Sequence, residues 1–171
     1  MKIDYLYELL LFVVLTLLQV LVFNQISVFG LATPFLYIYF LLKLPVDRNV
    51  FYVIILGYLM GFTLDVFLNT PGINAAATTL VAASRKPLLR LFFDKDIPAT
   101  YIPSLNSYTW AFIKFSIVAV VIHQTVLYGL EAFSLFNPEI LVLRWVTSIV
   151  LTLILIFALD SLISKTFIHD E

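Results

Sequence analysis

The chain has 171 residues, of which 62% are hydrophobic and only 12% are charged. A soluble domain of this length carries about twice that share of charge, and a small globule has too much surface to bury so many apolar side chains. The composition therefore predicts an integral membrane protein. The absence of cysteine excludes disulfides and thiolate sites, and the net charge of −1 offers no basic face for nucleic acid.

Six hydrophobic segments approach the length of about 20 residues that a membrane-spanning helix needs. In chain order they cover residues 5–24, 28–44, 50–68, 73–93, 108–130 and 140–163. The polar segment 94–107 separates the fourth from the fifth and is interpreted as a loop outside the bilayer. We therefore predict an all-α polytopic membrane protein, with residues 1–171 forming a single bundle of six transmembrane helices.

Two of the six segments depart from a simple span. The second holds Pro34 near its start, where a missing backbone N–H costs least. The fourth is free of charge only over residues 73–84. We expect it to continue with a kink near Pro87 while Arg85 and Lys86 extend toward the interface. The alternative is that it ends at Pro87 and the remainder lies on the membrane surface.

Basic residues orient the spans, because cytoplasmic connections carry an excess of lysine and arginine. Six spans place both termini on one side of the membrane. If that side is the cytoplasm, it holds Lys2, Lys43, Arg48, Arg85, Lys86, Arg90, Lys95 and Lys165. The outer connections 25–27, 69–72 and 131–139 then hold no basic residue. Both termini and the loop 94–107 are therefore predicted to be cytoplasmic.

Charged side chains inside the spans need partners, because a charge in hydrocarbon is costly. At 1.5 Å per residue, Asp65, His123 and Arg144 share a depth of about 21–24 Å above the inner face. We expect Asp65 to face the bundle and to contact Arg144, His123 or both; the alternative is that it only caps the following turn or reaches the outer headgroups. His123 is interpreted as a packing residue rather than as a proton relay or metal ligand. Near the inner face, Lys114 and Asp160 either pair or each extend to the interface.

Small residues gather around the turn between the third and fourth spans. Two of them form a G-x-x-x-G pattern on one helix face, and small residues let helices approach closely in lipid, where packing drives association. Contact within the chain and contact with a partner both fit this pattern. The candidate helix-packing or partner interface comprises Gly57, Gly61, Gly72, Ala75, Ala76 and Ala77.

The basic cluster Arg85, Lys86 and Arg90 is a candidate cytoplasmic contact, and its alternative role is that of a positive-inside anchor. No catalytic constellation is evident. The serines are scattered outside any nucleophile-elbow pattern, and no glycine-rich phosphate loop follows a strand. The sequence therefore predicts no enzyme activity, no metal site and no cofactor.

A family resemblance is carried by the region around the small residues. The residues concerned are Gly61 and Asp65 in a Gly-x-x-x-Asp pattern, Phe67, the turn Pro71-Gly72, Ala75-Ala76-Ala77, and the basic positions Arg85 and Arg90. This pattern, together with the length and the six hydrophobic segments, resembles the rod shape-determining protein MreD family. The richness in phenylalanine and tyrosine is similar to family members from the Bacteroidota.

The resemblance implies a non-enzymatic inner-membrane subunit of the bacterial cell-elongation complex. Its implied partners are the bitopic protein MreC, the RodA glycosyltransferase, the class B penicillin-binding transpeptidase and MreB filaments. The implied mechanism is that an apolar groove on the bundle receives the single transmembrane helix of MreC.

The family is also similar in fold to the six-helix S subunits of energy-coupling-factor vitamin transporters, although fold similarity alone does not transfer function. The alternative function is therefore a solute-binding, S-component-like subunit of a transporter. Its polar groups would be Asp65, Asn69, Asn74, His123, Gln124 and Arg144.

Overall fold

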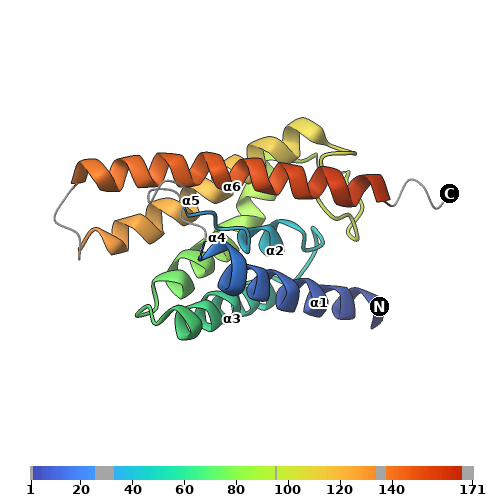
Figure 1. The fold of residues 1–171 in the computed structure, drawn as a ribbon. Coiled ribbons are helices and arrows are strands. Elements are labelled where there is room, and N and C mark those ends of the chain that lie inside the picture. Colours follow the sequence, from blue (N-terminus) through green and yellow to red (C-terminus); the bar gives the residue numbers. More distant parts are fainter. Residues whose placement is uncertain (1, 26–32, 95, 134–137, 167–171) are drawn as a thin grey trace.

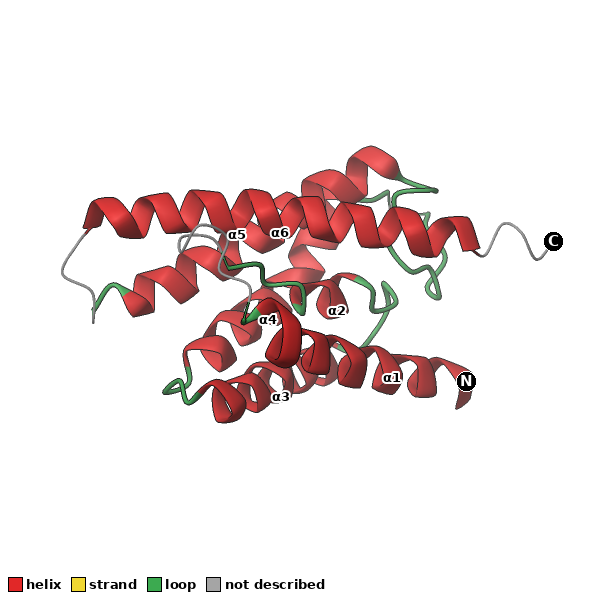
Figure 2. Cartoon of the chain, viewed as in Figure 1, coloured by secondary structure: helices red, strands yellow, loops and turns green. Residues whose placement is uncertain are grey.

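The computed structural model describes residues 2–25, 33–94, 96–133 and 138–166, and the regular elements in these ranges are all helices (Figure 2). They are α1 (Lys2–Leu18), the π-helical turn η1 (Gln19–Phe23), α2 (Ile38–Leu42), α3 (Val50–Leu68), α4 (Ile73–Phe92), α5 (Thr109–Glu131) and α6 (Pro138–Thr166).

Four helical segments are long and apolar enough to cross a membrane: Tyr5–Phe23, Val50–Leu68, Thr109–Glu131 and Glu139–Ile163. They match four of the six predicted spans. Large apolar side chains are exposed along α1, α3 and α6, as expected for surfaces that face lipid. These features show a membrane protein.

The helices run back and forth between two ends of the bundle (Figure 1). One end, here called the proximal end, holds the start of α1, the loop 43–49, the loop 93–108 and the end of α6. The other, the distal end, holds the tight turn between α3 and α4, the end of α5 and the start of α6. In the α3–α4 turn, Asn69 and Gly72 adopt left-handed backbone angles, with φ of 53° and 78°.

The segment from Phe35 to Leu44 lies at the centre of the bundle, and its apolar side chains are buried. The predicted helix 28–44 is wrong for its middle part: residues 33–37 are not helical, and only Ile38–Leu42 forms α2. Residues 28–32 lie outside the described ranges. Pro34 explains part of the difference, because it has no N–H to donate and disfavours helical angles at the preceding residue.

α4 is a continuous helix through Pro87, so the alternative in which it ends at that proline is wrong. It carries three basic residues in its second half and is not one of the four long apolar helices. α4 packs along α3 on one side and α5 on the other. It is therefore flanked by two apolar helices, and its remaining face, which includes Leu80 and Leu91, is exposed.

The polar loop between α4 and α5 is bound to the rest of the proximal end. The Val46 N–H donates to the Tyr101 carbonyl at 2.9 Å, and the Asp47 N–H donates to the Ala99 carbonyl at 3.2 Å. Because these bonds join the two proximal loops, the loop predicted at 94–107 is a packed part of the fold.

Candidate functional site

The non-helical segment 33–37 is held by polar side chains from η1 and α6. The Gln19 amide donates to the Pro34 carbonyl at 2.9 Å and accepts from the Leu36 N–H at 3.0 Å. The Phe35 N–H donates to the Thr152 hydroxyl at 3.0 Å. At membrane depth, backbone without helical bonds is tolerated only where protein groups satisfy it. These side chains therefore replace the missing helical bonds.

A second layer of hydrogen bonds fixes the α6 side chains of this site. The Gln124 amide donates to the Thr152 hydroxyl at 2.9 Å and to the Ser148 carbonyl at 3.1 Å. The Tyr128 and Ser148 hydroxyls lie 2.8 Å apart, and the Thr33 N–H donates to the same Ser148 hydroxyl at 3.1 Å. α5 and α6 are thus joined to the central segment by one connected network.

Asp65 lies at the end of α3 and caps the start of α4. Its carboxylate accepts from the Ala75 N–H at 2.8 Å, from the Asn74 N–H at 3.0 Å, and from the Thr70 hydroxyl. The first N–H groups of a helix have no partners within the helix and carry partial positive charge, so a carboxylate there is well placed. The buried Asp65 charge is therefore neutralised by the α4 N-terminus.

The predicted direct contact of Asp65 with Arg144 or His123 is wrong. Arg144 instead lies 3.8 Å from Glu131, and both are partly exposed. Asp65 faces the bundle as predicted. Its carboxylate accepts hydrogen bonds from the turn and the α4 N-terminus, so the turn-capping alternative is the correct one. Residue depth does not specify the direction in which a side chain leaves its helix, and Arg144 is directed to Glu131 instead of Asp65.

His123 is connected to Asp65 through two intervening side chains. The Tyr37 hydroxyl donates to the Asn74 side-chain oxygen at 2.9 Å and lies 2.8 Å from His123 Nε2. Because the single Tyr37 proton is used on Asn74, Nε2 of His123 is the donor in this pair. The Asn74 amide in turn donates to Asp65 at 3.0 Å. The outcome is a buried chain of four polar groups from α3 to α5.

Near the proximal end, Asp160 pairs with Lys43 rather than with Lys114. Asp160 Oδ1 lies 2.8 Å from Lys43 Nζ and accepts from the Tyr39 hydroxyl at 2.8 Å, while Oδ2 accepts from the Leu105 N–H at 2.8 Å. Lys114 is exposed and Asp160 is taken by Lys43, so the alternative in which these two residues pair is wrong. The alternative in which each extends to the interface is also wrong for Asp160, which is fully buried. Lys43, the first residue of the loop 43–49, is buried and reaches Asp160 from the bundle interior.

Glu8 of α1 is a further buried acid with dedicated partners. It accepts from Arg48 Nε at 2.8 Å and from the Tyr52 hydroxyl at 2.9 Å, and the Arg48 guanidinium lies 4.4 Å from the centre of the Tyr5 ring. This cluster ties α1 to the start of α3 at the proximal end.

Arg85 was predicted to extend to the membrane interface, but the structure buries it. It is 3% exposed and is the buried member of its basic cluster, whereas Lys86 is half-buried and Arg90 exposed. Its guanidinium donates to backbone carbonyls at and after the end of α2, where helical carbonyls lack partners. The acceptors are Leu41, Leu44 and Pro45. Of the predicted cytoplasmic contact, only Lys86 and Arg90 are therefore accessible.

The small residues of the predicted interface pack within the chain. A β-carbon added at Gly57 would lie 2.7 Å from Ala82 Cβ, and one at Gly61 would lie closer than 3.0 Å to atoms of Asn74, Ala75 and Thr78. Of the remaining candidates, two on α4 are buried and two residues are exposed. The buried pair is Ala75 and Ala77, and the exposed pair is Ala76 and Gly72. The helix-packing alternative is therefore the correct one for Gly57 and Gly61.

The site as a whole neutralises buried charge and replaces backbone hydrogen bonds. Within the described residues, no three His, Cys, Asp or Glu side chains gather as a metal site would require. Comparison of the chain with protein-family models, with curated proteins and with solved structures finds no match.

Several residues of this network were not predicted from the sequence, among them Gln19, Lys43 and Thr152. One signal could have revealed part of it. On α6 the buried polar side chains Ser148, Thr152 and Asp160 are separated by four and eight residues, which places them on one helix face. An apolar helix whose polar residues share a face buries that face against other protein.

Replacing Gln19 with leucine should lower the free energy of unfolding by about 2–6 kcal/mol. The substitution leaves the Leu36 N–H and the Pro34 carbonyl buried without partners, at about 1–3 kcal/mol for each group. Thermal unfolding in detergent, followed by tryptophan fluorescence, measures the loss. Thr16→Val is the control, because the Thr16 hydroxyl bonds to the Phe12 carbonyl of its own helix and otherwise only to the Met60 sulfur, a weak acceptor. Its effect should be much smaller. Equal losses in the two variants would contradict the special role of Gln19.

Proposed function

We propose that the chain is a non-enzymatic scaffold subunit of the bacterial inner membrane that crosses it six times, with both termini in the cytoplasm. In this proposal it works in the cell-elongation complex, beside MreC, RodA, the class B penicillin-binding transpeptidase and MreB. Its resemblance to the MreD family supplies these partners. Four long apolar helices and an even alternation of direction between the two ends support the multi-pass topology (Figure 1).

The main observation in favour of a scaffold function is that large side chains fill the centre of the bundle. Five large aromatic side chains occupy it, each at most 1% exposed: Tyr37, Tyr39, Phe40, Phe112 and Phe115. A solute-binding subunit needs a concave pocket in which a few polar groups converge on the ligand. Many of the central polar groups here are bonded to one another and to the backbone, although Ser116 Oγ, His123 Nδ1 and Gln124 Oε1 have no hydrogen-bond partner among the described residues. The aromatic filling and these internal bonds favour a scaffold over the transporter alternative.

The outer face of α3 supports docking of a transmembrane helix. Tyr58 and Phe62 are about half exposed and stack with ring centres 5.8 Å apart and planes 14° apart. Tyr58 lies about 12 Å along α3 from its first residue, well inside the hydrocarbon if α3 spans it. Its hydroxyl has no hydrogen bond to any described residue. A hydroxyl left in lipid without a partner is costly, and a docked polar side chain or backbone group would satisfy it.

This face replaces Gly57 and Gly61 as the proposed contact with MreC, because those glycines are covered by α4. The single transmembrane helix of MreC would lie along the Tyr58–Phe62 ridge. Aromatic side chains at the centre of an interface often carry much of its binding energy. The position of the docked helix would then set the state of the synthases attached to MreC.

Co-purification tests the proposal. The tagged chain, solubilised from its own host in mild detergent, should recover MreC and the cell-wall synthases, identified by mass spectrometry. The double variant Tyr58→Ala with Phe62→Ala should recover about tenfold less MreC, as expected for loss of two central aromatic contacts. The matched control is Val150→Ala with Ile154→Ala, two exposed apolar positions on α6.

Two results would contradict the proposal. Recovery of an ATPase pair or a bound metabolite, without MreC, would favour the transporter alternative. Equal loss of MreC from the α3 variant and the α6 control would keep the scaffold function but remove the docking face from α3.

A further inference from the structure

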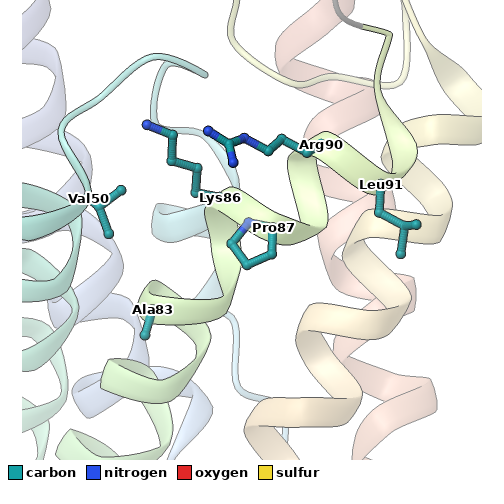
Figure 3. A pocket seen from close by; sticks show the side chains of 6 residues that line it. All are labelled: Val50, Ala83, Lys86, Pro87, Arg90 and Leu91. Atoms are coloured by element: carbon teal, nitrogen blue, oxygen red, sulfur yellow. The ribbon is translucent and has the colours of Figure 1, made fainter.

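An open pocket of about 480 Å³ lies between the start of α3 and the second half of α4 (Figure 3). Its lining combines two cationic side chains with four apolar residues. The lining residues are Val50, Ala83, Lys86, Pro87, Arg90 and Leu91. This pocket belongs to neither the central polar network nor the outer face of α3.

The two cations of the pocket lie one helical turn apart and extend from the same side of α4 (Figure 3). Neither Lys86 nor Arg90 has a hydrogen bond or ion pair with any residue in the described part of the chain. In contrast, the basic residues Lys43, Arg48 and Arg85 all have partners there. Like charges four residues apart on a helix repel each other, so an anion between them would stabilise the pair.

The apolar part of the pocket is continuous with the surface that faces lipid. Leu91 is 71% exposed and Ala83 is exposed, so no other part of the described chain covers them. Val50 is the first residue of α3, which places the pocket at the end of that apolar helix. A pocket at this level meets the region where phospholipid headgroups join their acyl chains.

We propose that this pocket binds one anionic phospholipid. Its phosphate lies between the Lys86 ammonium and the Arg90 guanidinium, and the upper part of an acyl chain lies against Ala83, Pro87 and Leu91. Basic pockets between membrane helices are suited to anionic headgroups, and a guanidinium binds phosphate through two parallel hydrogen bonds. This proposal depends only on the chain being a membrane protein. It does not depend on the proposed scaffold function or on MreC.

Native mass spectrometry of the detergent-purified full chain tests the site. The probe is dioleoyl phosphatidylglycerol, with dioleoyl phosphatidylcholine as the neutral comparison, and the readout is the affinity for the first lipid retained. The chain should retain phosphatidylglycerol in preference to phosphatidylcholine. Lys86→Gln and Arg90→Gln should each weaken phosphatidylglycerol binding about fivefold. Lys114→Gln removes one exposed charge elsewhere and should leave binding unchanged.

A second variant separates a shaped site from diffuse attraction. Ala83→Phe keeps every charge but fills the pocket with a ring, so it should also weaken binding about fivefold or more. Its thermal unfolding without lipid should match that of the wild type, because Ala83 is exposed.

Three results would overturn the proposal. Equal weakening by Lys86→Gln and Lys114→Gln, or no effect of Ala83→Phe, would mean that the positive charge attracts lipid without a site. Full competition by soluble glycerol phosphate would identify a free phosphate compound as the ligand instead of a lipid. Equal retention of the two lipids by the wild type would remove anion recognition altogether.

Discussion

Gly61→Ala should destabilise the fold by about 3 kcal/mol, more than is typical for adding one methyl group. Its β-carbon would come closer than 3.0 Å to Asn74, Ala75 and Thr78, and the Asn74 and Ala75 atoms concerned belong to the backbone of α4. Backbone cannot move aside as a side-chain end can, so α3 and α4 must separate. Overpacking of this kind costs about 1–3 kcal/mol or more and exceeds the gain of up to about 1 kcal/mol from replacing a helical glycine.

Gly129→Ala is the matched control for this prediction. Gly129 also lies in a helix, α5, but nothing lies within 4 Å of a β-carbon there. It should therefore leave stability unchanged or raise it by up to about 1 kcal/mol. Thermal unfolding in detergent, followed through Trp110 and Trp145, compares the two. If both alanine variants behave alike, the close approach of α3 to α4 is wrong.

Asp160→Asn should cost about 3–5 kcal/mol, because it leaves the Lys43 ammonium buried without a counter-charge. Lys43 is only 6% exposed, and Asp160 is fully buried. Lys43→Met should cost less, since Asp160 would keep the Tyr39 hydroxyl and the Leu105 N–H as donors. The variants are compared by urea or thermal unfolding of the purified protein in one detergent.

The double variant Lys43→Met with Asp160→Asn gives the sharper result. With both charges gone, its stability should exceed that of Asp160→Asn alone, because no unpaired ion remains in the interior. Simple addition of the two single losses would show that Lys43 and Asp160 do not act as a pair. Limited proteolysis at the loop 93–108 should also rise in Asp160→Asn, since Asp160 holds the Leu105 backbone.

The length of the hydrophobic segments was enough to locate α1, α3, α5 and α6. Every helix that spans lipid needs about 20 mostly apolar residues, and such segments are visible in the sequence. The burial of one charged residue was also predictable: Asp65 is buried and faces the bundle, as expected for a charge inside an apolar helix. Partner choice was not predictable from depth, since contact depends equally on rotation about each helix axis. Residue counting predicts the same depth for Arg144 and Asp65, but Arg144 pairs with Glu131 instead.

The central segment 33–44 could not be predicted because its stability comes from elsewhere in the chain. A short apolar run with a proline near its start fits a helix as well as a broken segment. The non-helical conformation depends on hydrogen bonds from the side chains of Gln19 and Thr152. The sequence of the segment itself does not specify these partners. The same holds for Arg85, whose acceptors exist only because α2 ends at Leu42.

The bonds from the central segment to α6 also set an order of events during synthesis. The Thr33 and Phe35 N–H groups find their acceptors 115 and 117 residues later in the chain. At about 5–20 residues per second, the ribosome reaches those acceptors roughly 6–23 s after making the donors. Until then, the segment has left the ribosome but lacks the groups that complete its hydrogen bonds. The middle of this bundle is therefore finished last, after both apolar ends of the chain are in place.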